Sequence, residues 1–125
     1  MDFASFKGNI LALKIDSKTN KGNHSYLIEE DLIAYYCART SLSKKDTLDV
    51  LVLKMNRLLK SDLKLSSFTM RISNMNFNIY GKGNKNNSEQ GKGLASFLNK
   101  LFVNKKLDNN TLKNYINEIM GEVIL

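Results

Sequence analysis

The sequence predicts a mainly helical α+β fold in a single domain, with a short strand near the N-terminus. Apolar residues recur at helical spacing through residues 29–60 and again through residues 94–120, which predicts helices in both regions. The apolar run at residues 9–16 is short and lies between Gly8 and a polar stretch, which favours a strand. A chain of 125 residues can bury a core without a metal or a disulfide.

We expect four segments within this domain, taken from the shifts in composition along the chain. They are an N-terminal strand and loop (1–25), a helical core (29–80), a basic glycine-rich loop (81–93) and C-terminal helices (94–125).

Two helix starts are predicted in the core. Residues 29–31 are acidic and lie in a first turn, where the positive end of the helix dipole favours them. Ser43 followed by Asp46 resembles a capping box that begins a second helix. That helix should end near Lys60, because its apolar stripe stops there. The stripe consists of Leu48, Leu51, Val52, Met55, Leu58 and Leu59.

Residues 66–80 fit two patterns. Read at period two, Phe68, Met70 and Ile72 alternate with polar residues, and a second alternation follows in the opposite phase, which is a hairpin pattern. Read at period 3.6, Phe68, Ile72 and Met75 share one helical face with Ile79. The pattern alone favours the hairpin, and both alternatives stay open at this point.

The net charge of +7 is concentrated in one part of the chain. Lysine outnumbers arginine 16 to 3 and asparagine occurs 16 times, so codon bias explains some of the basicity. Residues 81–106, however, carry six basic groups and one acidic group. Within them, residues 81–93 hold four of the seven glycines and no apolar side chain, which predicts a mobile exposed loop.

Several classes of protein are excluded or disfavoured by composition. One cysteine, Cys37, cannot form an internal disulfide, and its apolar helical neighbours favour a packed small side chain over a nucleophile. No apolar run reaches the roughly 18 residues that a membrane helix needs. We therefore expect a cytoplasmic protein with no membrane partner, no cofactor and no evident small-molecule substrate.

Two short motifs resemble a family module. Residues 67–75 read Ser-Phe-Thr-Met-Arg-Ile-Ser-Asn-Met, and Gly93-Leu94-Ala95 follows with Phe102 a few residues later. This block, with the helices before it, resembles a small helical module of bacterial restriction and HNH-nuclease-associated proteins. The resemblance spans residues 32–102. Met75 and Phe68 stand where that module has Phe and Val, respectively.

The resemblance implies a helix over residues 66–77, forming a helix-turn-helix or winged-helix-like pair with residues 46–60. It also implies a recognition module without its nuclease. An HNH site needs two histidines, whereas this chain has His24 alone, in a polar loop. We therefore expect no enzymatic activity.

The helical alternative makes double-stranded DNA the expected partner. The second helix of such a pair lies in the major groove with its N-terminal residues against base edges. Candidate contacts are Ser67, Met70, Arg71 and Asn74, with Arg71 suited to guanine and Asn74 to adenine. The competing interpretation is structural: Arg71 lies over the edge of the core and Asn74 is a turn residue of the hairpin.

Lysines that follow this segment suit phosphate contacts. Lys82, Lys85 and Lys92 occupy the position of a wing, and Lys100 extends the basic region into the next helix. A regulator, or a recognition element of a mobile-element or defence system, would fit, and a homodimer would raise its affinity. The alternative is a small protein-interaction module, such as a phage or plasmid inhibitor or immunity protein, that uses the basic region against an acidic partner.

Overall fold

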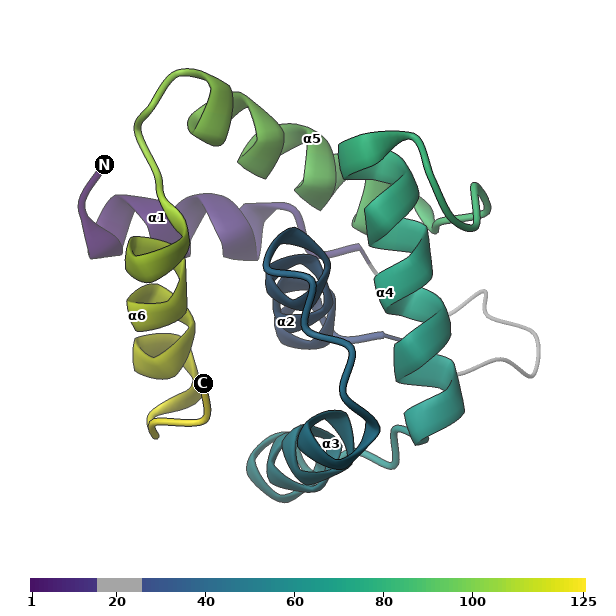
Figure 1. The fold of residues 1–125 in the computed structure, drawn as a ribbon. Helices are drawn as coiled ribbons and strands as arrows, with labels where there is room; N and C mark the ends of the chain where they lie inside the picture. Colours follow the sequence, from purple (N-terminus) through teal and green to yellow (C-terminus); the bar gives the residue numbers. More distant parts are fainter. Residues whose placement is uncertain (16–25) are drawn as a thin grey trace.

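The computed structural model describes residues 1–15 and 26–125, and these residues form six helices (Figure 1). They are α1 (Phe3–Ala12), α2 (Ile28–Arg39), α3 (Lys45–Leu59), α4 (Leu65–Tyr80), α5 (Glu89–Val103) and α6 (Asn109–Met120). No strand occurs in the described ranges, so the fold is all-helical and the predicted α+β class is wrong. The end of the predicted strand and the loop with His24 fall in residues 16–25, outside the described residues.

Helix α1 includes the first half of the strand predicted at residues 9–16. The Asp2 carboxylate accepts a hydrogen bond from a backbone N–H of the first turn at 2.8 Å and caps the helix. Phe6 and Ile10 are four residues apart and are both buried, and the Phe6 ring centroid lies 4.9 Å from that of Tyr115 in α6. The helical period therefore begins before the apolar run that suggested a strand.

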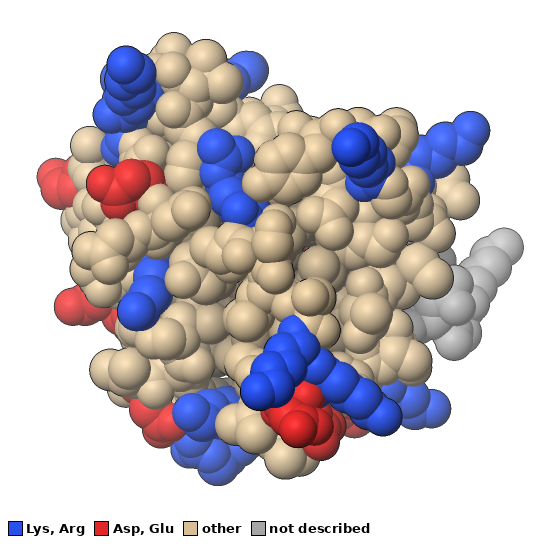
Figure 2. Space-filling view, viewed as in Figure 1, with Lys and Arg blue, Asp and Glu red and all other residues tan. Residues whose placement is uncertain are grey.

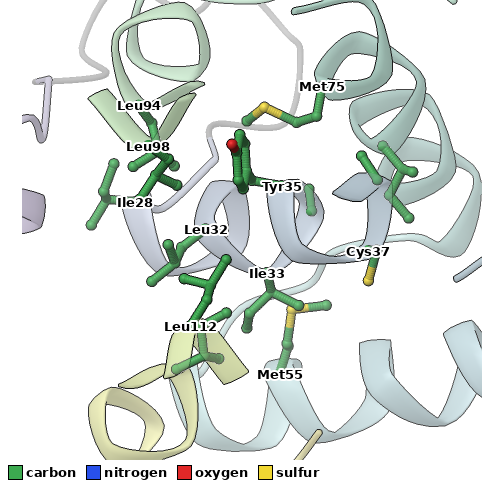
Figure 3. Packing of buried hydrophobic residues seen from close by; sticks show 14 of the residues in the cluster. Ile28, Leu32, Ile33, Tyr35, Cys37, Met55, Met75, Leu94, Leu98 and Leu112 are labelled. Carbon is green, nitrogen blue, oxygen red and sulfur yellow. The ribbon is translucent and has the colours of Figure 1, made fainter. Parts of the chain in front are cut away.

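Helix α2 forms the centre of the fold, and α4, α5 and α6 all pack against it (Figure 1). Its side chains are buried on nearly every side, as expected for a helix that is surrounded by other helices. Figure 3 shows apolar side chains of the neighbouring helices converging on it. They include Met55 of α3, Met75 of α4, Leu94 and Leu98 of α5, and Leu112 of α6.

Helix α3 buries Leu48, Leu51, Val52 and Met55 of the predicted stripe. The capping box predicted at Ser43 and Asp46 is wrong, because the helix begins after Lys44 and no side chain caps it. The helix ends where predicted, at a left-handed Lys60 with φ of 53°.

Helix α4 settles the ambiguity of residues 66–80, and the hairpin alternative is wrong. Phe68, Ile72 and Met75 lie on its buried face. The helix stops at Gly81, whose φ of 73° is a left-handed conformation that glycine adopts without strain. Helices α3 and α4 are thus consecutive and are joined by residues 60–64.

Helix α5 begins earlier than predicted and shortens the glycine-rich loop to residues 81–88. The Ser88 hydroxyl caps the helix by accepting a hydrogen bond from the Gly91 N–H at 3.0 Å. Gly91 and Gly93, which were predicted to be loop residues, are therefore helical.

Candidate nucleic-acid interface

Arg71 does not project from α4 towards solvent. Its side chain is 7% exposed and its Nε lies 3.0 Å from Oδ1 of Asp31, which is fully buried in α2. The guanidinium also lies over the Tyr26 ring at 3.8 Å from the centroid. The N–H groups of a guanidinium held in this way are not available to make two parallel hydrogen bonds to a guanine edge. We therefore do not retain Arg71 as a base-contacting residue, and its role is a buried ion pair between α2 and α4.

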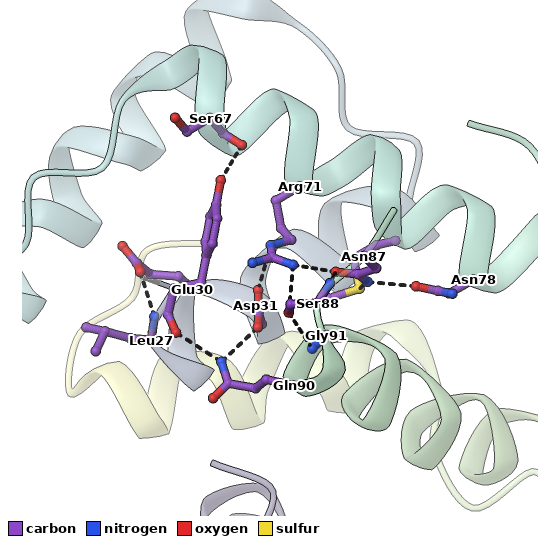
Figure 4. A network of polar contacts seen from close by, with 12 residues as sticks. Leu27, Glu30, Asp31, Ser67, Arg71, Asn78, Asn87, Ser88, Gln90 and Gly91 are labelled. Carbon is purple, nitrogen blue, oxygen red and sulfur yellow. Dashed lines mark hydrogen bonds and ion pairs between the residues drawn. The ribbon is translucent and has the colours of Figure 1, made fainter. Parts of the chain in front are cut away.

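Residues at the start of α5 complete this polar network (Figure 4). Arg71 donates hydrogen bonds to the Asn87 side-chain oxygen and to the Ser88 hydroxyl, the latter at 2.9 Å. Gln90 donates to the other carboxylate oxygen of Asp31 at 2.8 Å. Asn87 and Gln90 are both buried, so the network joins three helices within the core.

Sequence analysis missed most of this network. Asp31 stood out only as one of three acids at a helix start, and Asn87 and Gln90 lay in a stretch that was predicted to be an exposed loop. The available signal was the position of Asp31, which is followed directly by the buried residues Leu32 and Ile33. A buried charge next to an apolar run needs a partner, although the sequence does not say which residue provides it.

Asn74 is also buried, with an exposed fraction of 7%. Its side-chain oxygen has no hydrogen-bond partner among the described residues. This burial leads us not to propose Asn74 as a contact to adenine. The turn role considered for it in a hairpin is wrong, because it lies in the middle of α4.

The exposed residues of α4, apart from Tyr80 at its end, lie in its N-terminal half. Ser66, Thr69 and Met70 are exposed there, and the exposed fraction of Met70 is 51%. Ser67 is half-buried, and its carbonyl oxygen accepts a hydrogen bond from the Tyr26 hydroxyl at 2.5 Å.

A groove of about 620 Å³ runs beside these residues, and we call it the α4 groove. It lies between the start of α3, the first half of α4 and the loop that follows α4. It is lined by Ser43, Lys45, Leu48, Leu65, Ser66, Thr69, Met70, Ser73 and Asn84. Hydroxyl and amide groups and one lysine supply the polar lining, and no acidic side chain of the described residues contributes to it.

The loop 81–88 is fastened to α4 beside this groove. The backbone N–H of Asn84 donates to the Ser73 hydroxyl at 3.0 Å, and its side-chain amide lies 3.2 Å from the Met70 sulfur. Lys82 and Lys85 are exposed on this loop. Two of the predicted wing lysines therefore flank the accessible face of α4.

Lys92 and Lys100 meet in a second groove, of about 410 Å³, which we call the α5 groove. They are eight residues apart on α5 and so share one helical face. The rest of its lining is Asn78, Ser96, Asn99, Val103 and Asn104. Lys92 also lies 3.7 Å from Glu89 in an exposed ion pair, which contributes little in water.

Charge is dispersed over the face seen in Figure 2. Lys and Arg side chains lie at several separate places on this face, and near the bottom of the view they adjoin one another and Asp or Glu side chains. The basic residues of positions 81–106 lie on the loop, on α5 and just after α5.

The remaining candidate groups are structural. Burial raises the pKa of the Cys37 thiol to about 12, so the thiolate that a nucleophile needs does not form near neutral pH. Burial likewise raises the pKa of Tyr35 to about 12, and its hydroxyl donates to Asn99 at 2.6 Å. In residues 1–15 and 26–125, no cluster of His, Cys, Asp and Glu is arranged to hold a metal ion. None of the six helices is long and apolar enough to cross a bilayer.

Comparison of the chain with family models, curated protein sequences and solved structures finds no match. The resemblance to HNH-associated modules therefore stays a prediction.

Proposed function

We propose that the chain is a non-catalytic double-stranded DNA-binding protein that presents the first half of α4 to the duplex. The observation that carries the proposal is the lining of the α4 groove, which combines hydroxyl, amide and thioether groups with one lysine and no acid among the described residues. An acid-free surface at a helix N-terminus attracts phosphates, because the free N–H groups and the helix dipole both favour negative charge.

Base recognition in this proposal comes from small side chains and not from Arg71. A hydroxyl such as that of Ser66 can donate or accept at a base edge, the Thr69 oxygen can accept, and an apolar side chain such as Met70 suits the thymine methyl group. These residues lie in the first two turns of α4, where a recognition helix touches bases.

Phosphate contacts in this proposal come from lysines on the loop after α4 and on α5. Lys82 and Lys85 on the loop, and Lys92 and Lys100 in the α5 groove, would neutralise backbone charges without reading sequence. We propose that the protein acts in the cytoplasm as a regulator or as a recognition element of a mobile-element or defence system, for which the resemblance described above is the support.

The test of DNA binding is the salt dependence of duplex affinity, measured by fluorescence anisotropy on a panel of 30-base-pair duplexes. We expect Lys82→Glu/Lys85→Glu/Lys92→Glu to weaken binding to every duplex about tenfold or more. The slope of log affinity against log salt should fall by about 1 for each lysine lost.

The matched control is Lys7→Glu/Lys14→Glu/Lys113→Glu, which changes net charge equally but lies on α1, just after it, and on α6. Equal weakening by the two triple variants would show that only net charge matters. Absence of binding by the unmodified protein at low salt would end the DNA proposal.

Base reading by α4 has its own test in Thr69→Val, which removes a hydroxyl and keeps the side-chain shape. The Thr69 hydroxyl donates to the Leu65 carbonyl at 2.9 Å, so its oxygen remains able to accept from a base. We expect altered preference among duplexes, by about 1–3 kcal/mol at the position read, with an unchanged salt slope. Thr47→Val on α3 is the control, and an identical order of preference in both variants would contradict base reading.

A further inference from the structure

Helix α3 carries an outward stripe that the core does not use. Val50 and Leu53 are 51% and 64% exposed, respectively. Asp46 and Arg57 are exposed on the same face, so the stripe has residues at intervals of four, three and four. This is the spacing of the seam of a two-stranded coiled coil, in which apolar residues pack between helices.

Exposed apolar surface continues beside the stripe. A groove of about 480 Å³ borders Val50 and includes Tyr36, Leu42, Ile124 and Leu125 in its lining. Val123, in the C-terminal segment that supplies part of this lining, is 74% exposed. The same lining includes Asp46, Thr47 and Lys54, so apolar and polar side chains meet in the groove. A group of exposed apolar residues marks an interaction site more often than an isolated one does.

The order of residues along the stripe makes it complementary to itself. If two copies of α3 pack antiparallel about a two-fold axis between Val50 and Leu53, each Val50 meets the other copy's Leu53. The same operation brings each Asp46 to the other copy's Arg57. An acidic residue of one copy therefore faces a basic residue of the other copy at each end of the stripe.

We propose that this stripe is a homodimer interface, in which a second copy of the chain packs its α3 antiparallel to the first. A two-fold interface uses the same patch on both subunits, and only a self-complementary patch can do this. The reversed order of Asp46, Val50, Leu53 and Arg57 in the second copy supplies this self-complementarity. The neighbouring apolar groove would be covered by the same contact.

The dimer should be weak. The stripe has two apolar layers, and each copy of Arg57 already donates to Glu122 of its own chain at 2.5 Å. Such a seam buries less than the roughly 1,600 Å² of a typical stable complex. We therefore expect dissociation in the micromolar range, with monomers at low concentration.

The test is sedimentation velocity across a concentration series of the full chain without DNA, so that its outcome is independent of the proposed DNA binding. The average mass of the unmodified protein should rise from 14.2 kDa towards twice that value. Leu53→Glu should remain monomeric throughout, while Leu11→Glu, an exposed apolar site on α1, should behave like the unmodified protein. Circular dichroism would verify that both variants stay helical.

Charge exchange tests the antiparallel register. Asp46→Arg alone and Arg57→Asp alone should each weaken the dimer about tenfold, and the double variant should recover most of the loss because the pair is restored in reverse. A protein that stays at 14.2 kDa at the highest concentration would overturn the proposal. Normal dimerisation of Leu53→Glu would overturn the proposal too. If the double variant did not recover the affinity of the dimer, the antiparallel arrangement would be wrong.

Discussion

Replacing Arg71 with alanine should lower the free energy of unfolding by about 3–5 kcal/mol, because it removes the guanidinium whose Nε lies 3.0 Å from the buried Asp31 carboxylate. The Asn87 oxygen and the Ser88 hydroxyl lose a donor at the same time. A loss of this size is a large part of the total stability of a small domain. Urea unfolding followed by circular dichroism would measure it.

The control for this variant is Arg57→Ala, which removes an arginine of similar chemistry from an exposed ion pair with Glu122. Its unfolding midpoint should scarcely move, since water replaces the lost contact. The double variant Asp31→Leu/Arg71→Met should recover much of the loss, because it removes both charges together. Equal midpoints for Arg71→Ala and Arg57→Ala would refute the assignment of Arg71 to a buried pair.

A change at Arg71 affects the stability of the fold before it affects any contact with DNA. A variant at this position would bind poorly because the fold that presents α4 is weakened. Loss of binding by Arg71→Ala would therefore be no evidence of contact with a base. Thr69 and the lysines at positions 82, 85 and 92 are accessible, so changes there test the interface and not the core.

The sequence predicted α3 and α6 well because each has one apolar face and one polar face, so a single period describes it. It predicted α4 less well because Arg71, Asn74 and Asn78 interrupt the apolar face with polar groups. The alternation of apolar and polar residues at period two in this segment does not reflect a strand, because the segment is helical. The helix buries Arg71 and Asn74, which the hairpin alternative did not require. The local periodicity of the sequence does not predict that these polar residues are buried.

The sequence predicted some parts of the candidate site and missed others, because only some of them depend on neighbouring residues in the chain. The chain position of Lys82 and Lys85 beside α4 followed from sequence order, and the structure places their loop against that helix. The pairing of Asp31 with Arg71 joins residues 40 positions apart and depends on how α2 packs against α4. Packing between helices that are distant in the chain determines which polar residues of α4 reach solvent. This packing cannot be predicted from the local pattern of a single sequence.

Gly91→Ala should be the second strongly destabilising change, at about 1–3 kcal/mol, because α5 passes too close to Asn87 for any side chain. A Cβ atom at position 91 would lie 2.6 Å from the Cγ of Asn87. The Asn87 side chain cannot swing away freely, since its oxygen accepts from Arg71 and its amide donates to Asn78 at 2.7 Å. Relief of the clash would therefore cost hydrogen bonds inside the core.

Gly93→Ala in the same helix is a closely matched control, because a Cβ there meets no atom within 4 Å. It should raise stability by about 0.5–1 kcal/mol, as alanine is the better helix former. Thermal unfolding of the two variants should thus shift in opposite directions. In an Asn87→Ala background, Gly91→Ala should lose most of its cost, because the atoms that it strikes are gone. If the cost persisted there, close approach to Asn87 would not be the reason for glycine at position 91.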